Sequence, residues 1–288
     1  MADDLSVPKL FEFSQYVVLV TGGASGLGEM AAQAFVQNGA RVIIASRKEG
    51  ELRKTCERLN GMGPGKCEYI VADLKDKAGC VKLCEEVKKR TDRLHILLNN
   101  SGATWGADYY SFPESGWDKL MALNVKSIFY VTVGLEPLLL AASTPDNPAR
   151  VINVASIAGI QTLDVTTGDE GGLAQPGQGT FSYGPSKAAA IHLSKMLASK
   201  LAPRGVCVNV IAPGVFPSKM TSFGLERFGE RLVSGQPTGR IGRPRDFGGV
   251  VLFLSSLASA HMTGNVIELD GGANLTGWKG NAKSESKI

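Results

Sequence analysis

Short apolar runs rich in β-branched residues recur along the whole chain and alternate with longer segments of helical periodicity. The expected strands are residues 16–20, 41–45, 68–72, 95–99, 150–155, 206–212 and 265–269. The expected helices are residues 26–38, 48–60, 76–91, 118–142, 183–201 and 246–257. Strands that are apolar on both faces and joined by long crossovers form a parallel sheet covered by helices on both sides. The pattern therefore predicts an α/β, doubly wound fold with a seven-stranded parallel sheet.

No stretch rich in Pro, Gly or Ser divides this alternation, so we expect one domain over residues 1–288, with tails at 1–14 and 276–288. Two long segments interrupt the pattern: residues 161–180, interpreted as an insertion, and residues 214–240, interpreted as a substrate lid. Each follows the carboxyl end of a strand, where open α/β sheets bind their ligands. Both are therefore expected at the mouth of the site.

Composition narrows the class of partner. The 31 Lys and Arg residues against 27 Asp and Glu residues give a net charge of +4, too mild to indicate nucleic acid. The five cysteines contain no C-x-x-C pair, which favours a reduced, intracellular chain without a metal site.

No long apolar run or secretion signal is evident, so we expect a soluble, cytoplasmic protein that does not enter a membrane. The final Ser286-Lys287-Ile288 is close to a peroxisomal S-K-L address, and the alternative is a polar tail that ends this way by chance.

The segment TGGASGLGEMAAQAF, which begins at Thr21, places four glycines in its first eight residues, where the first expected strand gives way to its helix. A bare backbone there lets a pyrophosphate approach, and the N–H groups of the helix start hold its charge. A strand, turn and helix in this order predict a Rossmann-type dinucleotide site. Ser46 and Arg47 follow the second expected strand, with no carboxylate before Glu49. A guanidinium suits a 2′-phosphate, so NADPH is preferred over NADH; the alternative is that Arg47 is an ordinary charge opening the next helix.

Tyr183 and Lys187 are four residues apart in an expected helix and so share one face. An ammonium beside a phenol stabilises the phenolate, and we expect it to lower the phenol pKa from about 10 toward the working pH. Such a tyrosine is a usable general acid for a carbonyl. Ser156, at the end of a strand, is placed to hydrogen-bond a substrate oxygen as negative charge develops. Taken alone, the Tyr–Lys pair could equally belong to an ordinary surface helix.

The spacing of Gly22, Gly26 and Gly28 resembles the T-G-x-x-x-G-x-G turn of the short-chain dehydrogenase/reductase family. The likeness continues through NNSG (99–102), Asn124 in ALNV, Ser156 in NVASIAG, YGPSK (183–187), APG (212–214) and DGG (270–272), and covers roughly residues 12–275. It implies that Tyr183 donates the proton, Ser156 orients the carbonyl, Lys187 tunes the tyrosine and binds the ribose, and Asn124 holds a relay water. The cofactor site implied by the motifs and the resemblance is Thr21, Gly22, Ser25, Gly26, Leu27, Gly28, Ser46, Arg47, Asp73, Leu74, Asn100, Gly102, Tyr183, Lys187, Pro213, Gly214, Val215 and Ser218. Asp73 is also a candidate helix N-cap.

Within that family the chain is most similar to 3-oxoacyl-[acyl-carrier-protein] reductases, particularly the rhamnolipid-biosynthesis type. The resemblance implies NADPH-dependent reduction of a ketone to a secondary alcohol, on an acyl group that is free, on CoA or on a carrier protein. It also implies a homotetramer, with a dimer second. One departure matters, because residues 161–180 roughly double the usual interval between the serine and tyrosine motifs. The alternatives are a secondary-alcohol dehydrogenase, a polyketide, steroid or quinone ketoreductase, or a noncatalytic NADPH-binding scaffold; a scaffold would be marked by loss of one of the four catalytic residues, and none is lost.

Overall fold

The computed structural model describes residues 4–162 and 177–276. The strands are β1 (Val17–Thr21), β2 (Arg41–Ser46), β3 (Lys66–Val71), β4 (Ile96–Asn99), β5 (Ala149–Val154), β6 (Val206–Pro213) and β7 (Val266–Leu269). The α-helices are α1 (Val7–Leu10), α2 (Gly26–Gln37), α3 (Glu49–Asn60), α4 (Lys77–Lys88), α5 (Glu114–Met121), α6 (Ser127–Ala142), α7 (Tyr183–Leu201), α8 (Ser222–Ser234), α9 (Pro244–Ser255) and α10 (Ala273–Thr276). All seven expected strands are confirmed, with small shifts at their ends.

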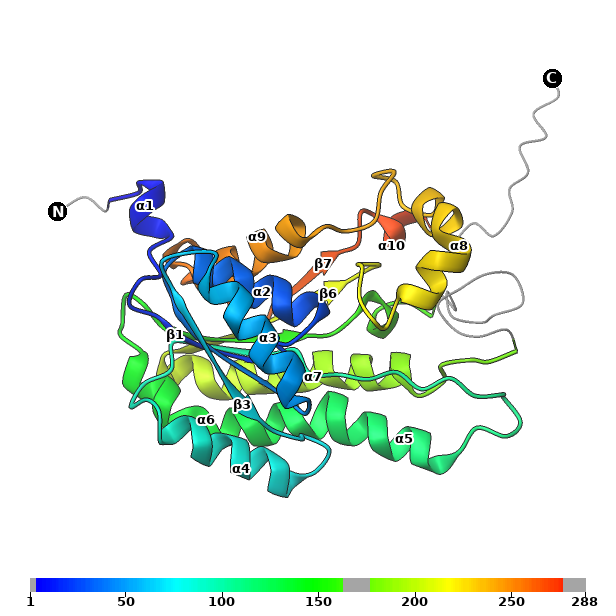
Figure 1. The fold of residues 1–288 in the computed structure, drawn as a ribbon, viewed down its shortest axis with the longest axis horizontal. Coiled ribbons are helices and arrows are strands. Elements are labelled where there is room, and N and C mark those ends of the chain that lie inside the picture. Colours follow the sequence, from blue (N-terminus) through cyan, green and yellow to red (C-terminus); the bar gives the residue numbers. More distant parts are fainter. Residues whose placement is uncertain (1–3, 163–176, 277–288) are drawn as a thin grey trace.

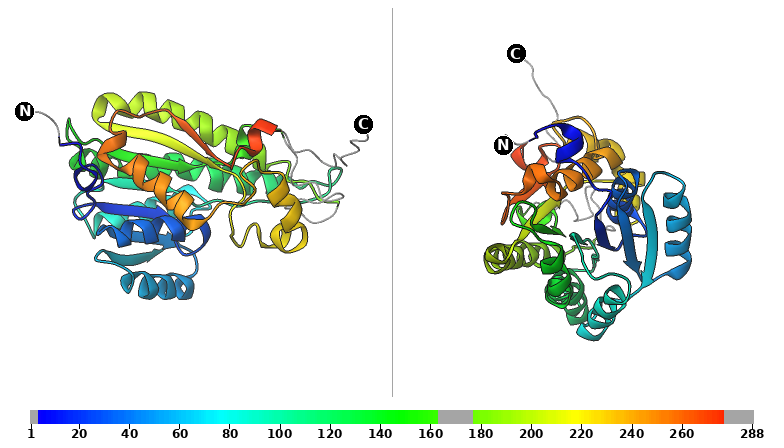
Figure 2. Two further views of the ribbon diagram at one scale, coloured as in Figure 1. Left: turned by 90° about the horizontal axis from the view of Figure 1, so that it is seen from above. Right: turned by 90° about the vertical axis from the view of Figure 1, so that its left-hand side faces the viewer.

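The strands form one parallel sheet in the order β3-β2-β1-β4-β5-β6-β7. The order reverses between β1 and β4, which opens a crevice at the carboxyl ends of the strands. Helices α2, α3 and α9 cover one face of the sheet, and α4, α6 and α7 cover the other (Figures 1 and 2). The predicted doubly wound fold is therefore confirmed.

Alternation along β1, an inner strand of the sheet, explains the two helical layers. Val18 and Val20 of β1 pack into the core under α2 and α9, whereas Val17 and Leu19 pack into the core under α4 and α6. Because successive side chains of a strand point to opposite faces, a strand between two helical layers must be apolar throughout. This requirement produces the uninterrupted apolar runs in the sequence.

The structure adds detail that the sequence pattern missed. Residues 114–142 form one continuous helical stretch, in which a π-helical turn, Ala122–Lys126, joins α5 to α6. By length and composition this stretch could cross a membrane, but Asn124 and the inner side of α6 are buried in the protein. The tail expected over residues 1–14 is not wholly peripheral, because the Phe13 ring is 1% exposed and packs in the core.

A buried cation occupies the amino end of β5, away from the crevice. Arg150 is 1% exposed, and its guanidinium donates to Asn147 Oδ1 at 2.6 Å and to the Ser256 carbonyl at 2.8 Å. Asn147 in turn donates to the Tyr16 hydroxyl at 2.8 Å. Ser256 caps the carboxyl end of α9, where a positive charge meets the negative end of the helix dipole. Arg150 therefore ties β5 to α9.

Candidate active site

A cavity of about 400 Å³ lies at the carboxyl ends of β1 to β5. The glycine turn forms one wall, with positive φ at Gly22 (66°) and Gly26 (56°), which a side chain would strain. The predicted cofactor residues that line this cavity are Gly22, Ser25, Gly26, Leu27, Ser46, Arg47, Asp73, Leu74, Asn100, Gly102, Tyr183, Lys187 and Ser218. The structure thus brings together residues that lie almost 200 positions apart in the sequence.

Two of the predicted cofactor residues support the turn from behind and do not line either cavity. The Thr21 hydroxyl is buried and accepts the backbone N–H groups of Asn100 and Ser101, each at 3.0 Å. Gly28 lies against the backbone of the glycine turn, because a Cβ there would meet the Gly22 oxygen at 2.3 Å. Asn100 completes the frame by donating its side-chain amide to the Thr21 carbonyl at 3.0 Å. These contacts hold β1 and β4 in register beneath the cavity.

Basic side chains surround the end of the cavity near β2. Arg47 is exposed there and has no hydrogen-bond or ion-pair partner among the described residues. Lys48 and Lys219 also line this end, and both pair with Glu51, at 3.5 Å and 2.7 Å. Sequence reasoning missed Lys219, because it lies in the segment after β6 and only the fold places it opposite α3.

A second cavity, of about 300 Å³, adjoins the first. Pro213, Gly214 and Val215 line it, and so do the apolar side chains of the expected lid, Phe216, Met220 and Phe223. The ends of the expected insertion also reach its mouth: Gln161, Gln178 and Thr180 line the cavity, and Gly179 pairs with Ala107 in an antiparallel bridge. Residues 163–176 of the insertion lie outside the described residues.

Tyr183 lies where the two cavities meet, because its side chain lines both. Ser156 lines the second cavity beside it, in a turn after β5 that packs on the start of α7. Burial raises the pKa of the Tyr183 phenol, and a hydrogen bond with the Ser156 hydroxyl acts in the opposite direction. A hydroxyl pair at the junction can therefore reach a ligand atom placed between the cavities.

Lys187 lines the first cavity one helical turn beyond Tyr183. Its side chain is 5% exposed, its Nζ donates to the Val154 carbonyl at 3.0 Å, and burial lowers its pKa to about 8. The expected shared face is confirmed, since Nζ lies 5.7 Å from the centre of the Tyr183 ring. The expected lowering of the tyrosine pKa is wrong for this structure. Burial opposes the charged form of each group, and for Tyr183 it outweighs the favourable contacts.

Asn124 sits in the π-helical turn between α5 and α6 and does not line either cavity. Its side chain bonds both backbone groups of Ala103, accepting at 2.9 Å and donating at 3.0 Å, and it donates to the Ser186 hydroxyl at 2.9 Å. Both amide hydrogens are therefore engaged. Asn124 fixes the loop after β4 against α7, and its expected role with a relay water stays a prediction.

The comparisons with known proteins agree with this geometry. A family model described as enoyl-(acyl carrier protein) reductase matches residues 22–274. A rhamnolipids biosynthesis 3-oxoacyl-[acyl-carrier-protein] reductase from Pseudomonas aeruginosa is 42% identical over 268 residues, covering 92% of this chain and 98% of that protein. The chain belongs to the short-chain dehydrogenase/reductase family. It is an oxidoreductase of that family, as the resemblance in its motifs implied.

Further members of the short-chain dehydrogenase/reductase family support the assignment. The 3-oxoacyl-[acyl-carrier-protein] reductase FabG of Thermotoga maritima is 33% identical and covers 89% of this chain and 96% of that protein. Among solved structures, the Pseudomonas aeruginosa RhlG/NADP active-site complex superimposes with a TM-score of 0.84 at 41% identity, covering 92% of this chain and 98% of that one. A short-chain type dehydrogenase/reductase from Mycobacterium marinum gives a TM-score of 0.82 at 27% identity, covering 93% and 99%.

Proposed function

We propose that this protein is an NADPH-dependent carbonyl reductase that converts the ketone of a 3-oxoacyl-type substrate to a secondary alcohol. The observation that carries the proposal is the position of Tyr183 at the junction of two cavities, with Ser156 on one side and Lys187 on the other. The first cavity suits the dinucleotide and the second suits the substrate. Relatives described as 3-oxoacyl-[acyl-carrier-protein] reductases support this assignment.

The residues of the first cavity fit NADPH. A Cβ at Gly102 would come within 3.3 Å of Asn124 Oδ1 and 3.4 Å of Lys187 Nζ, so the bare backbone leaves room for a ribose beside the lysine. The glycine turn and the start of α2 would hold the pyrophosphate. Ser46 and Arg47 would hold the 2′-phosphate, and Asp73 with Leu74 would border the adenine. The NADP in the RhlG complex supports the same choice of cofactor.

The hydride for the carbonyl carbon would come from bound NADPH, and side chains of this protein would act on the carbonyl oxygen. Ser156 orients the carbonyl by donating a hydrogen bond, which strengthens as the oxygen gains negative charge. Tyr183 transfers its hydroxyl proton to that oxygen and becomes a phenolate. At pH 7 a lysine with a pKa of about 8 is roughly ten-to-one protonated, so Lys187 presents a positive charge to the phenolate as it forms.

Burial keeps the Tyr183 phenol protonated, as a proton donor to a carbonyl must be. The same hydroxyl, once deprotonated, would be the base for alcohol oxidation, so this pKa shift does not separate the carbonyl reductase from the secondary-alcohol dehydrogenase. Relatives described as 3-oxoacyl-[acyl-carrier-protein] reductases are what favour reduction.

The second cavity indicates an apolar substrate tail. Besides the lid side chains, Ile157 and Ala158 line it, together with the hydroxyls of Ser156 and Tyr183 and other polar residues. A 3-oxoacyl chain suits a cavity with both kinds of lining, because its reacting ketone is polar and the remainder of its chain is apolar. The carrier of the acyl group is left open by these contacts.

The proposed function is tested by following NADPH oxidation at 340 nm across 3-oxoacyl thioesters, diketones, quinones and cyclic ketones, with NADH as comparison. We expect turnover of the 3-oxoacyl thioesters with NADPH. Tyr183→Phe should lower kcat by about 10³-fold or more while NADPH still binds, because the phenylalanine keeps the ring and loses the proton. Unchanged turnover in this variant would reject the proton-donor role. Turnover confined to quinones or cyclic ketones would show that the substrate is not a 3-oxoacyl compound.

The cofactor preference has its own test at Arg47. Arg47→Gln should raise KM for NADPH by about 10-fold or more and leave KM for NADH nearly unchanged, because only NADPH carries the 2′-phosphate. The matched control is Arg53→Gln, which removes a charge from α3, the helix that follows Arg47, outside the cavity. Equal effects of the Arg47 change on both cofactors would show that Arg47 does not read the phosphate.

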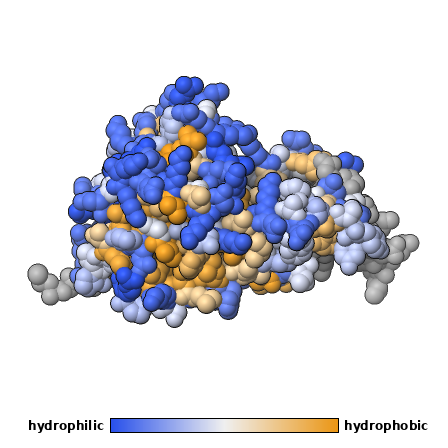
Figure 3. Space-filling view, turned by 90° about the horizontal axis from the view of Figure 1, so that it is seen from below, coloured by the Kyte–Doolittle hydropathy of each residue, from blue (hydrophilic) through white to orange (hydrophobic). Residues whose placement is uncertain are grey.

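We further propose that the protein is a homotetramer. Apolar side chains gather on the face that carries α4, α5 and α6 (Figure 3). Trp117, Phe129 and Val133 are 39%, 42% and 45% exposed there. Strand β7 leaves a sheet edge open elsewhere, so two separate surfaces are available for pairing copies. The mass of the protein in solution, measured by scattering, tests this proposal. A mass of two copies would mean that only one of the two surfaces pairs copies.

The proposed location is the cytoplasm. The relatives reported above come from bacteria, so they lend no support to a peroxisomal address. The residues that would form that address, Ser286 to Ile288, lie outside the described residues.

A further inference from the structure

Two of the five cysteines meet inside the protein, far along the sequence from the catalytic groups. Cys56 lies in α3 and Cys67 in β3, and their Sγ atoms are 3.2 Å apart. Each residue is 6% exposed. A disulfide bond is about 2.05 Å long, so an approach of about 1.1 Å would join them.

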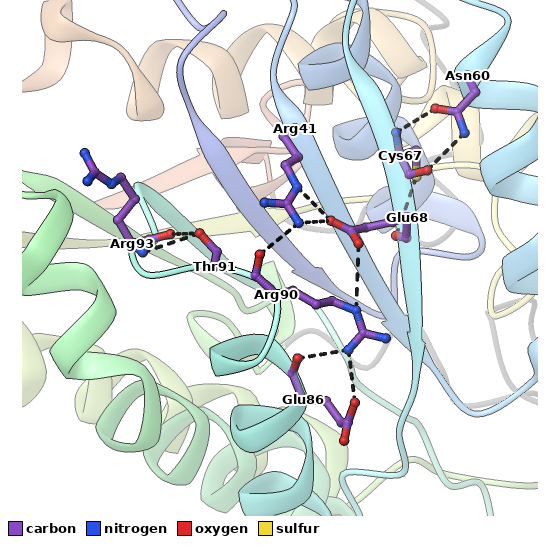
Figure 4. Close-up of polar contacts among 8 residues, drawn as sticks. All are labelled: Arg41, Asn60, Cys67, Glu68, Glu86, Arg90, Thr91 and Arg93. Carbon is purple, nitrogen blue, oxygen red and sulfur yellow. Dashed lines mark hydrogen bonds and ion pairs between the residues drawn. The ribbon is translucent and has the colours of Figure 1, made fainter.

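The backbone around the pair already holds both elements in place. The Asn60 side chain donates to the Cys67 carbonyl at 3.0 Å and accepts its N–H at 2.7 Å, as Figure 4 shows. On the other side, the Thr55 hydroxyl donates to the Ala24 carbonyl in the glycine turn at 3.2 Å. A bond between the two sulfurs would therefore form within a fixed frame.

The contact also makes the two thiols unequal. A hydrogen bond with Cys67 lowers the pKa of the Cys56 thiol, against the effects of burial and of the nearby Glu57 and Glu68 carboxylates. The same hydrogen bond, together with burial, raises the pKa of Cys67. Burial raises the pKa of the other three thiols, Cys80, Cys84 and Cys207, and each of these donates to a main-chain carbonyl. Cys56 is thus the thiol best placed to react as a thiolate.

We propose that Cys56 and Cys67 form a redox-active pair, which a peroxide-class oxidant converts to a disulfide linking α3 to β3. The Cys56 thiolate attacks one peroxide oxygen, the O–O bond breaks, and the leaving hydroxide takes a proton to become water. Cys56 is then a sulfenic acid. The Cys67 sulfur attacks the Cys56 sulfur, the S–O bond breaks, and the Cys67 proton leaves with the hydroxide as a second water. Two thiols are oxidised by two electrons in total, and one peroxide is reduced to two waters.

The disulfide would act on the half of the sheet that carries the adenosine side of the cofactor cavity. It closes a short loop between residues 11 positions apart, which restricts the unfolded chain. We expect the oxidised protein to melt higher by about 5 °C. Tyr183 and Lys187 lie on α7, on the other side of the sheet, so kcat should stay within about twofold of the reduced protein.

Peptide mapping of the full-length wild-type protein tests the linkage. The folded protein is treated with hydrogen peroxide, alkylated, and digested with trypsin without reduction. Cleavage after Lys54, Arg58, Lys66 and Lys75 places the two cysteines in separate peptides, residues 55–58 and 67–75. We expect these peptides joined, two hydrogens lighter than their sum, and released by dithiothreitol. Recovery of both peptides as alkylated thiols, or a link between Cys80 and Cys84, would overturn the proposal.

Two variants separate the steps. Cys67→Ser removes the resolving thiol, so peroxide should leave Cys56 as a sulfenic acid that a dimedone-type probe captures, with no rise in Tm. Cys207→Ser removes a buried thiol that has no cysteine partner, and it should still form the linked peptides. A disulfide that forms without any change in Tm would contradict the bridging of α3 and β3 as a stabilising link.

Discussion

A buried cation lies at each end of strand β5, and the two cations differ in their hydrogen-bond partners and in their pKa. At the amino end, the Arg150 guanidinium has the Asn147 side chain and the Ser256 carbonyl as partners. At the carboxyl end, Lys187 has the Val154 carbonyl as its hydrogen-bond partner among the described residues. Burial lowers the pKa of both, but an arginine side chain stays charged, whereas the pKa of Lys187 falls to about 8.

The difference would separate a structural charge from the charge that the proposed mechanism uses. Two fixed acceptors, one of them at a helix end, bind the Arg150 guanidinium, so its charge joins elements. Lys187 is left with one acceptor and an open cavity, so its charge is available to a ligand and to Tyr183. The comparison predicts that changes at one end affect the rate of catalysis and changes at the other affect stability.

The largest expected effect is at the carboxyl end. Lys187→Met should lower kcat/KM by about 10³-fold, because the phenolate and the ribose lose their cation. Its free energy of unfolding at pH 7 should equal or exceed that of the wild type, because a costly buried charge is gone. Initial rates at 340 nm and urea denaturation measure the two quantities. A variant that kept its rate and lost stability would reverse the comparison.

Arg150→Met should show the opposite pattern. Loss of the guanidinium leaves the Asn147 and Ser256 acceptors without their donor, and we expect about 4 kcal/mol less free energy of unfolding. The rate per folded molecule should stay within about twofold of the wild type. Arg150→Lys is the matched control, since it keeps the charge and loses the forked geometry. A rate loss as large as that of Lys187→Met would remove the distinction between the two ends.

The smallest of these effects is a pH dependence of stability. The pKa of Lys187 is about 8 when folded and 10.5 in its ordinary state, so between these values the unfolded chain binds more protons. The free energy of unfolding should therefore rise with pH over this window, by up to about 3 kcal/mol. Subtracting the profile of Lys187→Met cancels the other groups. A flat difference profile would mean that Lys187 is not buried as a cation.

The same pKa predicts a pH dependence of the rate. Reductase activity should fall above about pH 8 as Lys187 loses its proton.

Sequence reasoning recovered the sheet and named many of the residues that line the first cavity, because both follow from local patterns. Strand alternation and helical spacing depend on residues that are close in the sequence, and the glycine turn can be recognised from eight consecutive residues. It missed Lys219 at the cavity rim, the π-helical turn that holds Asn124, and the direction of the Tyr183 pKa shift. Each of these depends on which distant segments come into contact and on how much water they exclude.

By itself, the sequence determined which side chains are present and in what order: a glycine turn after the first strand, Ser156 after the fifth, and Tyr183 one helical turn from Lys187. Only the tertiary structure decided that Tyr183 stands at the junction of two cavities, that Lys187 is buried with one acceptor and Arg150 with two, and that Cys56 meets Cys67. The reason is physical. Periodicity is set by the geometry of a single strand or helix, whereas pKa and contact are set by the groups that parallel crossovers bring together from distant parts of the chain.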